Sequence, residues 1–269
     1  MHIVVCAKRI PDPEISGVSF KIDPETQRRV ELPGLKMVMS PYDEQCFEAA
    51  LRVRESQDES VRITALCLGQ GEDVKIFKDA FAWDADEGIF ISDPAFVSGD
   101  GYTTATVLSA AIEKLGDVDL ILVGRQAADR DEGVVGYGIA ELLGIPLLPC
   151  AADVKLNDGL LVIERFLDNG SEILEAALPV VVTISNEIGT PRKPTMRQIM
   201  KAGRKKPETW NATDLGLDVD QPGVGTARLL VEEIFVPDNH RECEFVTGDT
   251  PAECAQRVVD QLKELRVLS

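Results

Sequence analysis

Short apolar runs alternate with stretches of helical periodicity over the first two thirds of the chain. The predicted strands are Ile3–Cys6, Arg62–Leu68, Gly88–Ile91, Leu120–Val123 and Val180–Ser185. The predicted helices between them are Asp43–Ser56, Asp73–Ala82, Thr103–Leu115 and Val135–Leu143. The strands are continuous apolar runs rather than alternating ones, which is typical of strands buried on both faces. The order of elements therefore predicts an α/β fold with a doubly wound, mostly parallel sheet.

Two segments interrupt this alternation of strands and helices. Residues Pro11–Met39 form a long polar connection, and a loop of that length in a compact domain is usually functional or covers a partner. Alternating apolar runs at Leu161–Arg165 and Ile173–Ala177 flank the turn sequence Asp168-Asn169-Gly170. This arrangement predicts a β-hairpin insertion.

The chain changes character after Lys206. Residues 207–225 are rich in Asp, Pro and Gly, and Thr250–Leu268 then has the cap and the apolar stripe of a terminal helix. A helix at the end of a weakly structured tail must dock its stripe on its own domain or on another chain. We therefore expect an α/β domain over residues 1–206, and an extended C-terminal arm over 207–269 whose helix docks on that domain or on a partner subunit.

Length and composition limit the class of protein. The chain has 269 residues, 44% of them apolar, which suffices for one sizeable core. No apolar run approaches the roughly 20 residues of a membrane-spanning helix. The N-terminus enters a strand at once and lacks the pattern of a signal peptide or a mitochondrial presequence. A cytoplasmic protein is the simplest interpretation, with a mature form that has lost a presequence as the alternative.

The inventory of cysteine and histidine argues against several chemistries. Six cysteines are scattered without a Cys-x-x-Cys motif, which supports neither a disulfide framework nor a zinc or iron–sulfur site. The two histidines, His2 and His240, leave little basis for a Ser/His/Asp triad or a His-ligated metal. We therefore expect no catalytic residue and no metal ligand.

The net charge of −18 argues against binding to nucleic acid or to an anionic membrane. One stretch has the opposite charge and contains no acid. Its seven basic residues are Arg192, Lys193, Arg197, Lys201, Arg204, Lys205 and Lys206. Such a run is either a solvated face or a contact surface for an acidic partner.

Candidate chemistry lies at the carboxyl ends of the predicted strands, where open parallel sheets bind ligands. Ser40-Pro41-Tyr42-Asp43 has the pattern of a capping box at a helix start. Leu66–Gly71 ends a strand with a tight turn, but Val74 stands where a dinucleotide fingerprint needs its third glycine.

The strongest candidate is the glycine-punctuated loop from Gly124 to Gly136, which runs from a predicted strand into a predicted helix. Such a loop can place several backbone N–H groups around a phosphate. Arg125 and Arg130 would add positive charge, which the acidic side chains of the same loop would oppose. The residues alone predict a nucleotide site here.

Several motifs, in order along residues 1 to about 218, resemble the electron-transfer flavoprotein β subunit. The opening reads Ile-Val-Val-Cys-Ala-Lys-Arg-Ile-Pro-Asp, and Ser-Pro-Tyr-Asp-Glu begins at residue 40. Gly-Arg-Gln-Ala-x-Asp-x-Asp begins at residue 124, and Arg-x-x-Asp-x-Gly-x-Glu at residue 165. Leu-Pro-Val-Val-Val-Thr begins at residue 178, and Arg-Lys-Pro-Thr-x-x-Gln-Ile-Met-Lys-Ala at residue 192.

The resemblance implies half of a heterodimer. The α subunit of the family carries most contacts to an FAD, which the β subunit helps to frame, and the β subunit binds an AMP in an adenine-nucleotide-binding α/β domain. The pair takes electrons from dehydrogenases, such as acyl-CoA dehydrogenases, to a quinone reductase or another acceptor. The redox activity resides in the bound flavin, so the chain would be an electron carrier subunit rather than an enzyme. In bifurcating members of the family a second FAD replaces the AMP.

The resemblance also implies site residues. The cofactor-binding residues would be Cys6, Ser40, Pro41, Tyr42, Asp43, Leu68, Gly124, Arg125, Gln126, Ala127, Ala128, Asp129, Arg130, Asp131, Glu132, Gly133, Val134 and Val135. Tyr42 would also approach the flavin of the α subunit. The loop Asn186–Thr195 would recognise dehydrogenases, with Ile188 as its apolar anchor and Arg192 and Lys193 as basic contacts.

The chain departs from the family pattern at the nucleotide site. The family usually has Asn where Ser40 stands, and it usually has Asn-Gln or Ala-Gln followed by Thr or Val where this chain has Gly133, Val134 and Val135. Bifurcating members have a small glycine at the position of Arg130. These departures favour AMP over a second FAD. Two other classes stay open: a nucleotide-processing enzyme that uses the carboxylates between 129 and 132 for a metal, and a homodimeric ligand-sensing module.

Overall fold

The computed structural model describes residues 1–14, 22–23, 28–30, 34–57, 60–97, 99–157, 159–229, 231–235 and 243–268. Part of the predicted connection Pro11–Met39, and His240, lie outside these ranges. Residue contacts divide the chain into two units. The first consists of residues 1–21 and 29–232, and the second of residues 22–28 and 233–269.

The first unit is built on one seven-stranded sheet in which every strand pair is parallel. Its strands in spatial order are β14 (Glu208–Trp210), β7 (Glu87–Ile91), β6 (Arg62–Leu68), β1 (His2–Cys6), β8 (Leu120–Gly124), β13 (Val180–Ile184) and β9 (Leu147–Ala151). Every residue of β1, β8 and β13 is buried. Their continuous apolar sequences therefore lie at the centre of the sheet, and the predicted α/β fold is confirmed.

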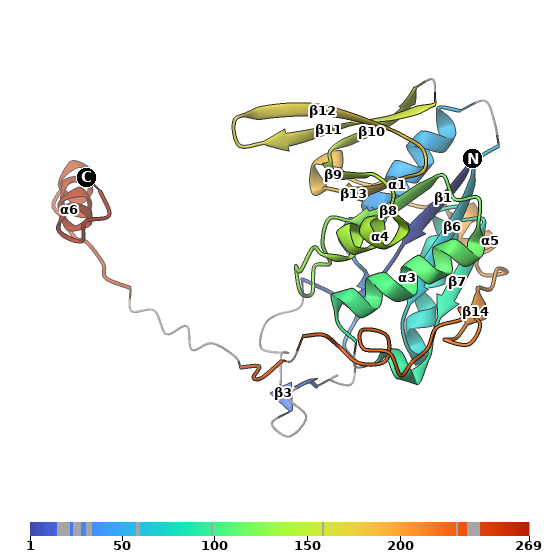
Figure 1. Cartoon of the computed structure of the whole chain (residues 1–269). Coiled ribbons are helices and arrows are strands. Elements are labelled where there is room, and N and C mark those ends of the chain that lie inside the picture. The colour runs from blue at the N-terminus through green and yellow to red at the C-terminus, as the bar shows by residue number, and fades with distance from the viewer. Residues whose placement is uncertain are drawn as a thin grey trace. The chain divides into compact units, whose positions relative to one another are not determined.

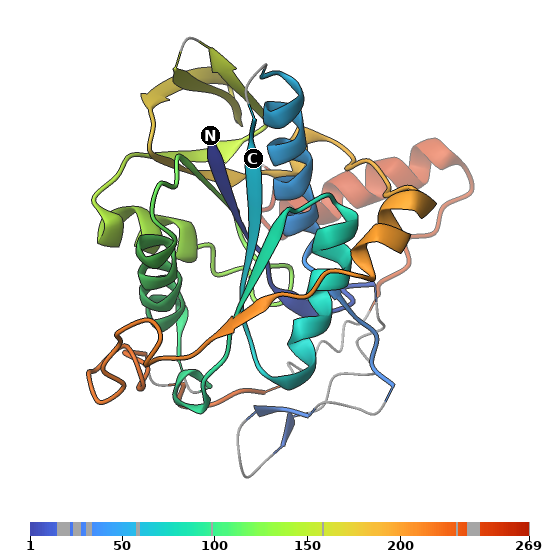
Figure 2. The ribbon, with the colours of Figure 1, turned by 90° about the vertical axis from the view of Figure 1, so that its right-hand side faces the viewer.

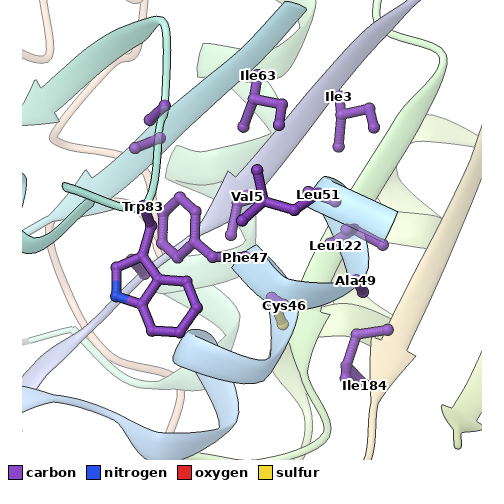
Figure 3. Close-up of a cluster of buried hydrophobic side chains, with 14 of the residues drawn as sticks. Ile3, Val5, Cys46, Phe47, Ala49, Leu51, Ile63, Trp83, Leu122 and Ile184 are labelled. Atoms are coloured by element: carbon purple, nitrogen blue, oxygen red, sulfur yellow. The ribbon is translucent and has the colours of Figure 1, made fainter. Parts of the chain in front are cut away.

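Helices cover both faces of this sheet (Figures 1 and 2). On one face lie α1 (Pro41–Glu55), α2 (Ile76–Ala82) and α5 (Met196–Ala202), and on the other α3 (Gly101–Leu115) and α4 (Val135–Leu143). Figure 3 shows Phe47 and Leu51 of α1 beside Val5 and Leu122 of the central strands. Burial of such side chains contributes about 1.5–3 kcal/mol each, which fixes α1 and its N-terminus against the sheet.

The predicted hairpin insertion is also confirmed. Strands β11 (Leu160–Leu167) and β12 (Gly170–Ala177) pair antiparallel, and β10 (Asp153–Asn157) adds a third strand on the other side of β11. Leu161 and Ile163 are buried in the same cluster as α1. The hairpin sheet therefore covers the α1 side of the domain.

The α/β domain continues beyond the boundary that we expected at residue 206, because β14 extends the main sheet through β7. Its Trp210 is buried in the cluster beneath α3. The remaining short elements of the described residues are β2 (Arg9–Pro11), β3 (Ile22–Asp23), β4 (Arg28–Arg29), β5 (Met37–Met39), η2 (Gly71–Lys75), η3 (Pro94–Phe96) and η4 (Asn186–Ile188). The second unit contains α6 (Pro251–Glu264), which confirms the predicted terminal helix. Throughout the described ranges, every helix falls short of the length or apolarity needed to cross a lipid bilayer.

Candidate functional site

A cavity of about 530 Å³ lies at the carboxyl ends of β1, β6 and β8, and we call it the pocket. Its rim comes from the segments that follow four neighbouring strands: 6–8, 66–70, 96–97 with 99–101, and 123–135. Its apolar wall consists of Leu66, Leu68, Phe96, Leu108 and Val123. The parallel order of the strands brings these distant segments together, as open α/β sheets do at their ligand sites.

Four helix starts surround the pocket, and their charges differ. Asp43 lies in the first turn of α1, Asp73 in that of η2, and Asp100 caps α3 with an acceptor bond from the Thr103 N–H at 2.9 Å. Within the described chain, α4 begins without an acidic residue in its first turn and without a side-chain cap on its N-cap residue, Val134. The first N–H groups of a helix have no intrahelical partner and favour an anion. The start of α4 is therefore the best-placed anion site on the rim.

The loop from β8 to α4 turns sharply to reach this helix start. Asp131 and Gly133 both adopt positive φ, +55° and +64°. A Cβ on Gly133 would lie 3.1 Å from the Arg125 carbonyl oxygen, and one on Gly136 would lie 2.6 Å from Thr183 Cγ2. These two glycines allow the loop to fold against its own start and α4 to approach β13.

The capping box predicted at Ser40 and Asp43 is wrong. Ser40 is fully buried and its Oγ has no hydrogen-bond partner among the described residues. The Asp43 carboxylate instead accepts the Lys8 backbone N–H at 2.7 Å. The competing donor wins because Lys8 follows β1, whose carboxyl end lies beside the start of α1. Asp43 thus connects the two segments rather than capping its own helix.

Lys8 and Asp43 also set the electrostatics of the pocket. Burial raises the pKa of Asp43 to about 8, although the Lys8 N–H and charge act in the opposite direction. The carboxyl is therefore largely protonated at neutral pH. The Lys8 ammonium pairs with Asp129 at 2.7 Å, and Arg130 pairs with Glu132 at 3.7 Å. These ion pairs moderate the acidity of the rim.

The structure brings most of the predicted cofactor residues into the pocket. Those that line it are Cys6, Asp43, Leu68, Gly124, Gln126, Ala127, Asp129, Arg130, Glu132, Gly133, Val134 and Val135. The remaining predicted residues, which do not line it, are Ser40, Pro41, Tyr42, Arg125, Ala128 and Asp131.

Tyr42, Arg125 and Gln126 form a small group of their own. The Gln126 amide donates to the Tyr42 hydroxyl at 3.1 Å, and the Arg125 guanidinium lies 5.6 Å from the centre of the Tyr42 ring. Neither Tyr42 nor Arg125 lines the pocket. Gln126, which lines the pocket, therefore connects it to a polar contact outside the cavity that Tyr42 and Arg125 form.

Sequence reasoning missed one wall of the pocket, the segment that leads into α3. Phe96, Val97, Asp100 and Gly101 all line the cavity. Gly101 permits close contact with the loop, since a Cβ there would lie 2.5 Å from Val134 Cγ2. The Asp-Gly pair before an amphipathic helix, after a strand of the same sheet, was the signal that could have identified it.

The structure places Ile188 differently from its predicted role. Its side chain is only 4% exposed and belongs to the cluster beneath α1, so it has no free surface to insert into another protein. In this structure Ile188 packs into its own core, so the predicted anchor role would require the loop to rearrange when a dehydrogenase binds. Arg192 is also engaged, because it binds the buried Glu48 carboxylate at 2.8 Å and pairs with Glu55.

Exposed apolar side chains lie instead on α5, directly after the predicted loop. Met196, Ile199 and Met200 are 72%, 48% and 70% exposed. Their i, i+3, i+4 spacing places them on one side of the helix. Lys193, Arg197 and Lys201 are exposed in the same segment. We call these six residues the α5 surface.

Comparison with known proteins gives concordant results. The family model described as electron transfer flavoprotein domain matches residues 31–215. Over the full length of both chains, the sequence is 33% identical to the electron transfer flavoprotein subunit beta of Thermoanaerobacterium thermosaccharolyticum. It is 32% identical, again over both full lengths, to the caffeyl-CoA reductase-Etf complex subunit CarD of Acetobacterium woodii. Identity to the electron transfer flavoprotein subunit beta of Megasphaera elsdenii is 32%, covering 98% of this chain and 97% of that one.

Proposed function

The chain belongs to the electron transfer flavoprotein family as a β subunit, and we propose that its pocket binds one AMP while the chain pairs with an FAD-carrying α subunit. The observation that carries the proposal is the start of α4, the helix start on the pocket rim that has neither an acid in its first turn nor a side-chain cap. A phosphate there would accept hydrogen bonds from the first backbone N–H groups of α4, as anions do at helix N-termini.

The rest of the pocket fits a base and a ribose. The apolar wall that includes Leu66, Leu68 and Phe96 suits the faces of an adenine ring. A volume of about 530 Å³ lies within the range of pockets for a single small ligand. A pyrophosphate would bring a second anionic group toward Asp100, Asp129 or Glu132 on the same rim. The charge distribution therefore favours AMP over a second FAD.

In this proposal the chain is an electron carrier subunit and has no substrate of its own. The flavin supplies the redox chemistry of the heterodimer, and this chain positions it and the partners. Tyr42 and Arg125 lie outside the pocket and form the contact toward the flavin of the α subunit. A nucleotide-processing enzyme has less support, because Asp129, Asp131 and Glu132 are bonded to Lys8, Gln126 and Arg130 respectively.

We further propose that the α5 surface, together with the loop before it, contacts electron-donating dehydrogenases. It combines an unpaired apolar patch with basic side chains in a chain whose net charge is −18. Met side chains adapt to differently shaped pockets, and the basic residues complement an acidic rim and speed association. Electrons then pass from such a dehydrogenase to the flavin, and on to a quinone reductase or another acceptor.

The nucleotide proposal is tested on the heterodimer purified from cells that express both subunits. Denaturation should release one FAD and one AMP per heterodimer, quantified by chromatography and mass spectrometry. Two FAD and no AMP would replace our assignment with the bifurcating type. One FAD with no other adenine nucleotide would contradict a nucleotide in this pocket.

A further inference from the structure

The end of the first unit returns to the rim of the pocket. The backbone N–H groups of Arg228 and Leu229 donate to Asp100 Oδ2 at 2.8 and 3.0 Å, while Oδ1 accepts the Thr103 N–H. Asp100 itself lines the pocket. One carboxylate thus holds the start of α3 together with a segment 128 residues further along the chain.

Contacts on either side of Asp100 extend this connection. The Arg228 guanidinium lies 3.5 Å from the centre of the Tyr102 ring, which follows Gly101 in α3. Gly101 in turn touches Val134 so closely that a Cβ would lie 2.5 Å from Val134 Cγ2. A continuous path of contacts therefore leads from the start of α4, through Asp100, to Leu229.

The attachment of Leu229 depends on this carboxylate. Its side chain is 72% exposed, so apolar burial does little to hold it. Partial burial acts to raise the pKa of Asp100, but the N–H donors of Thr103, Leu229 and Arg228 outweigh it and hold the pKa below its usual value. Hydrogen bonds to an ionised acceptor are the stronger kind.

We propose that Asp100 couples the occupation of the pocket to the attachment of residues 228–229, and through them to the C-terminal arm that we expect to dock on the partner subunit. The inference rests on the proposed nucleotide site. A phosphate at the start of α4 restrains Val134 and Gly101, which keeps Asp100 oriented toward Arg228 and Leu229. Coupling between two binding events is reciprocal, so AMP strengthens subunit association by the factor with which association strengthens AMP binding.

The test uses three full-length chains depleted of nucleotide: wild type, Leu229→Pro and Leu229→Ala. Proline lacks an N–H and removes one bond to Asp100, whereas alanine keeps it, and neither change touches the pocket. AMP binding is first measured by calorimetry. Hydrogen exchange of the Arg228 amide is then compared with and without AMP, and subunit dissociation constants are measured in parallel.

In wild type and Leu229→Ala, AMP should slow exchange at Arg228 and tighten subunit association about fivefold or more, the lower end of typical couplings. In Leu229→Pro both effects should fall below about twofold while AMP still binds. AMP binding without an effect on wild type, or with an equal effect on Leu229→Pro, would overturn the coupling and leave the ligand assignment intact. No heat of AMP binding to wild type would overturn both.

Discussion

The pocket and the α5 surface differ in how far their side chains are paired within the chain. At the pocket, polar side chains are matched by the chain's own partners, as with Lys8 and Asp129, and one helix start is left for a ligand. On α5, apolar side chains such as Met196 and Met200 remain uncovered. If the two proposals hold, the site for a bound nucleotide is organised by contacts within the chain, whereas the docking site leaves its apolar side chains exposed until a partner covers them.

Substitution of Ile188 tests whether this residue is buried while Met196, on nearby α5, is exposed. We expect Ile188→Ala to lower the free energy of unfolding by about 2–5 kcal/mol, because it removes a buried branched side chain and leaves a cavity. Met196→Ala, its matched control, should change stability by less than about 0.5 kcal/mol. Urea denaturation monitored by circular dichroism measures both. Equal losses for the two variants would erase the contrast between the positions.

Val134→Asp tests the open helix start of the pocket. An aspartate there would give α4 an acidic side chain like those at the starts of η2 and α3, and would oppose a phosphate by like-charge repulsion of several kcal/mol. We expect AMP affinity to fall by about 100-fold or more, with thermal stability retained. Val134→Asn is the matched control, since it can cap the helix without charge. If purified Val134→Asp contained as much AMP as wild type, the phosphate would have to bind at another part of the rim.

Met196→Ala tests the α5 surface as a docking site. Loss of a buried apolar anchor weakens binding by about 1.5–3 kcal/mol, so the dehydrogenase concentration at half-maximal flavin reduction should rise roughly tenfold or more. Heterodimer formation and flavin content should not change. Ile173→Ala, which removes a similarly exposed apolar side chain from β12 of the hairpin sheet, serves as the control. Wild-type kinetics for Met196→Ala at every dehydrogenase concentration would remove the α5 surface from the docking contact.

Asp43 provides the smallest and most specific test of the pocket. Its folded-state pKa of about 8 exceeds the ordinary value of 3.8, so the folded protein holds a proton that the unfolded chain releases between these values. This contribution to stability is complete below pH 4 and is lost as pH rises toward 8. We expect a loss of about 1 kcal/mol between about pH 7 and 8, absent in Asp43→Asn. If the stability of wild type and of Asp43→Asn changed with pH in the same way, the proton would not be held by Asp43.

Much of the fold and of the site followed from the sequence for local reasons. Continuous apolar runs predicted the central strands because a parallel sheet buries both faces, and Asp168-Asn169-Gly170 predicted the hairpin turn because its residues suit that backbone. The loop from Gly124 to Val135 was placed at the pocket because a strand end and a helix start enclose it. The resemblance to the family added the expectation of a bound AMP and of a flavin-carrying partner subunit.

Only the tertiary structure determined the contacts of several side chains. Asp43 binds the Lys8 N–H rather than its own helix because two segments meet that the sequence separates by 35 residues. Ile188 and Met196 are both apolar residues near the same loop, yet one is buried and the other exposed according to which side of the backbone faces the sheet. Asp100 joins the pocket to Leu229 for the same reason. Local periodicity determines what an element is, whereas packing between distant segments determines which of its side chains remain free to act.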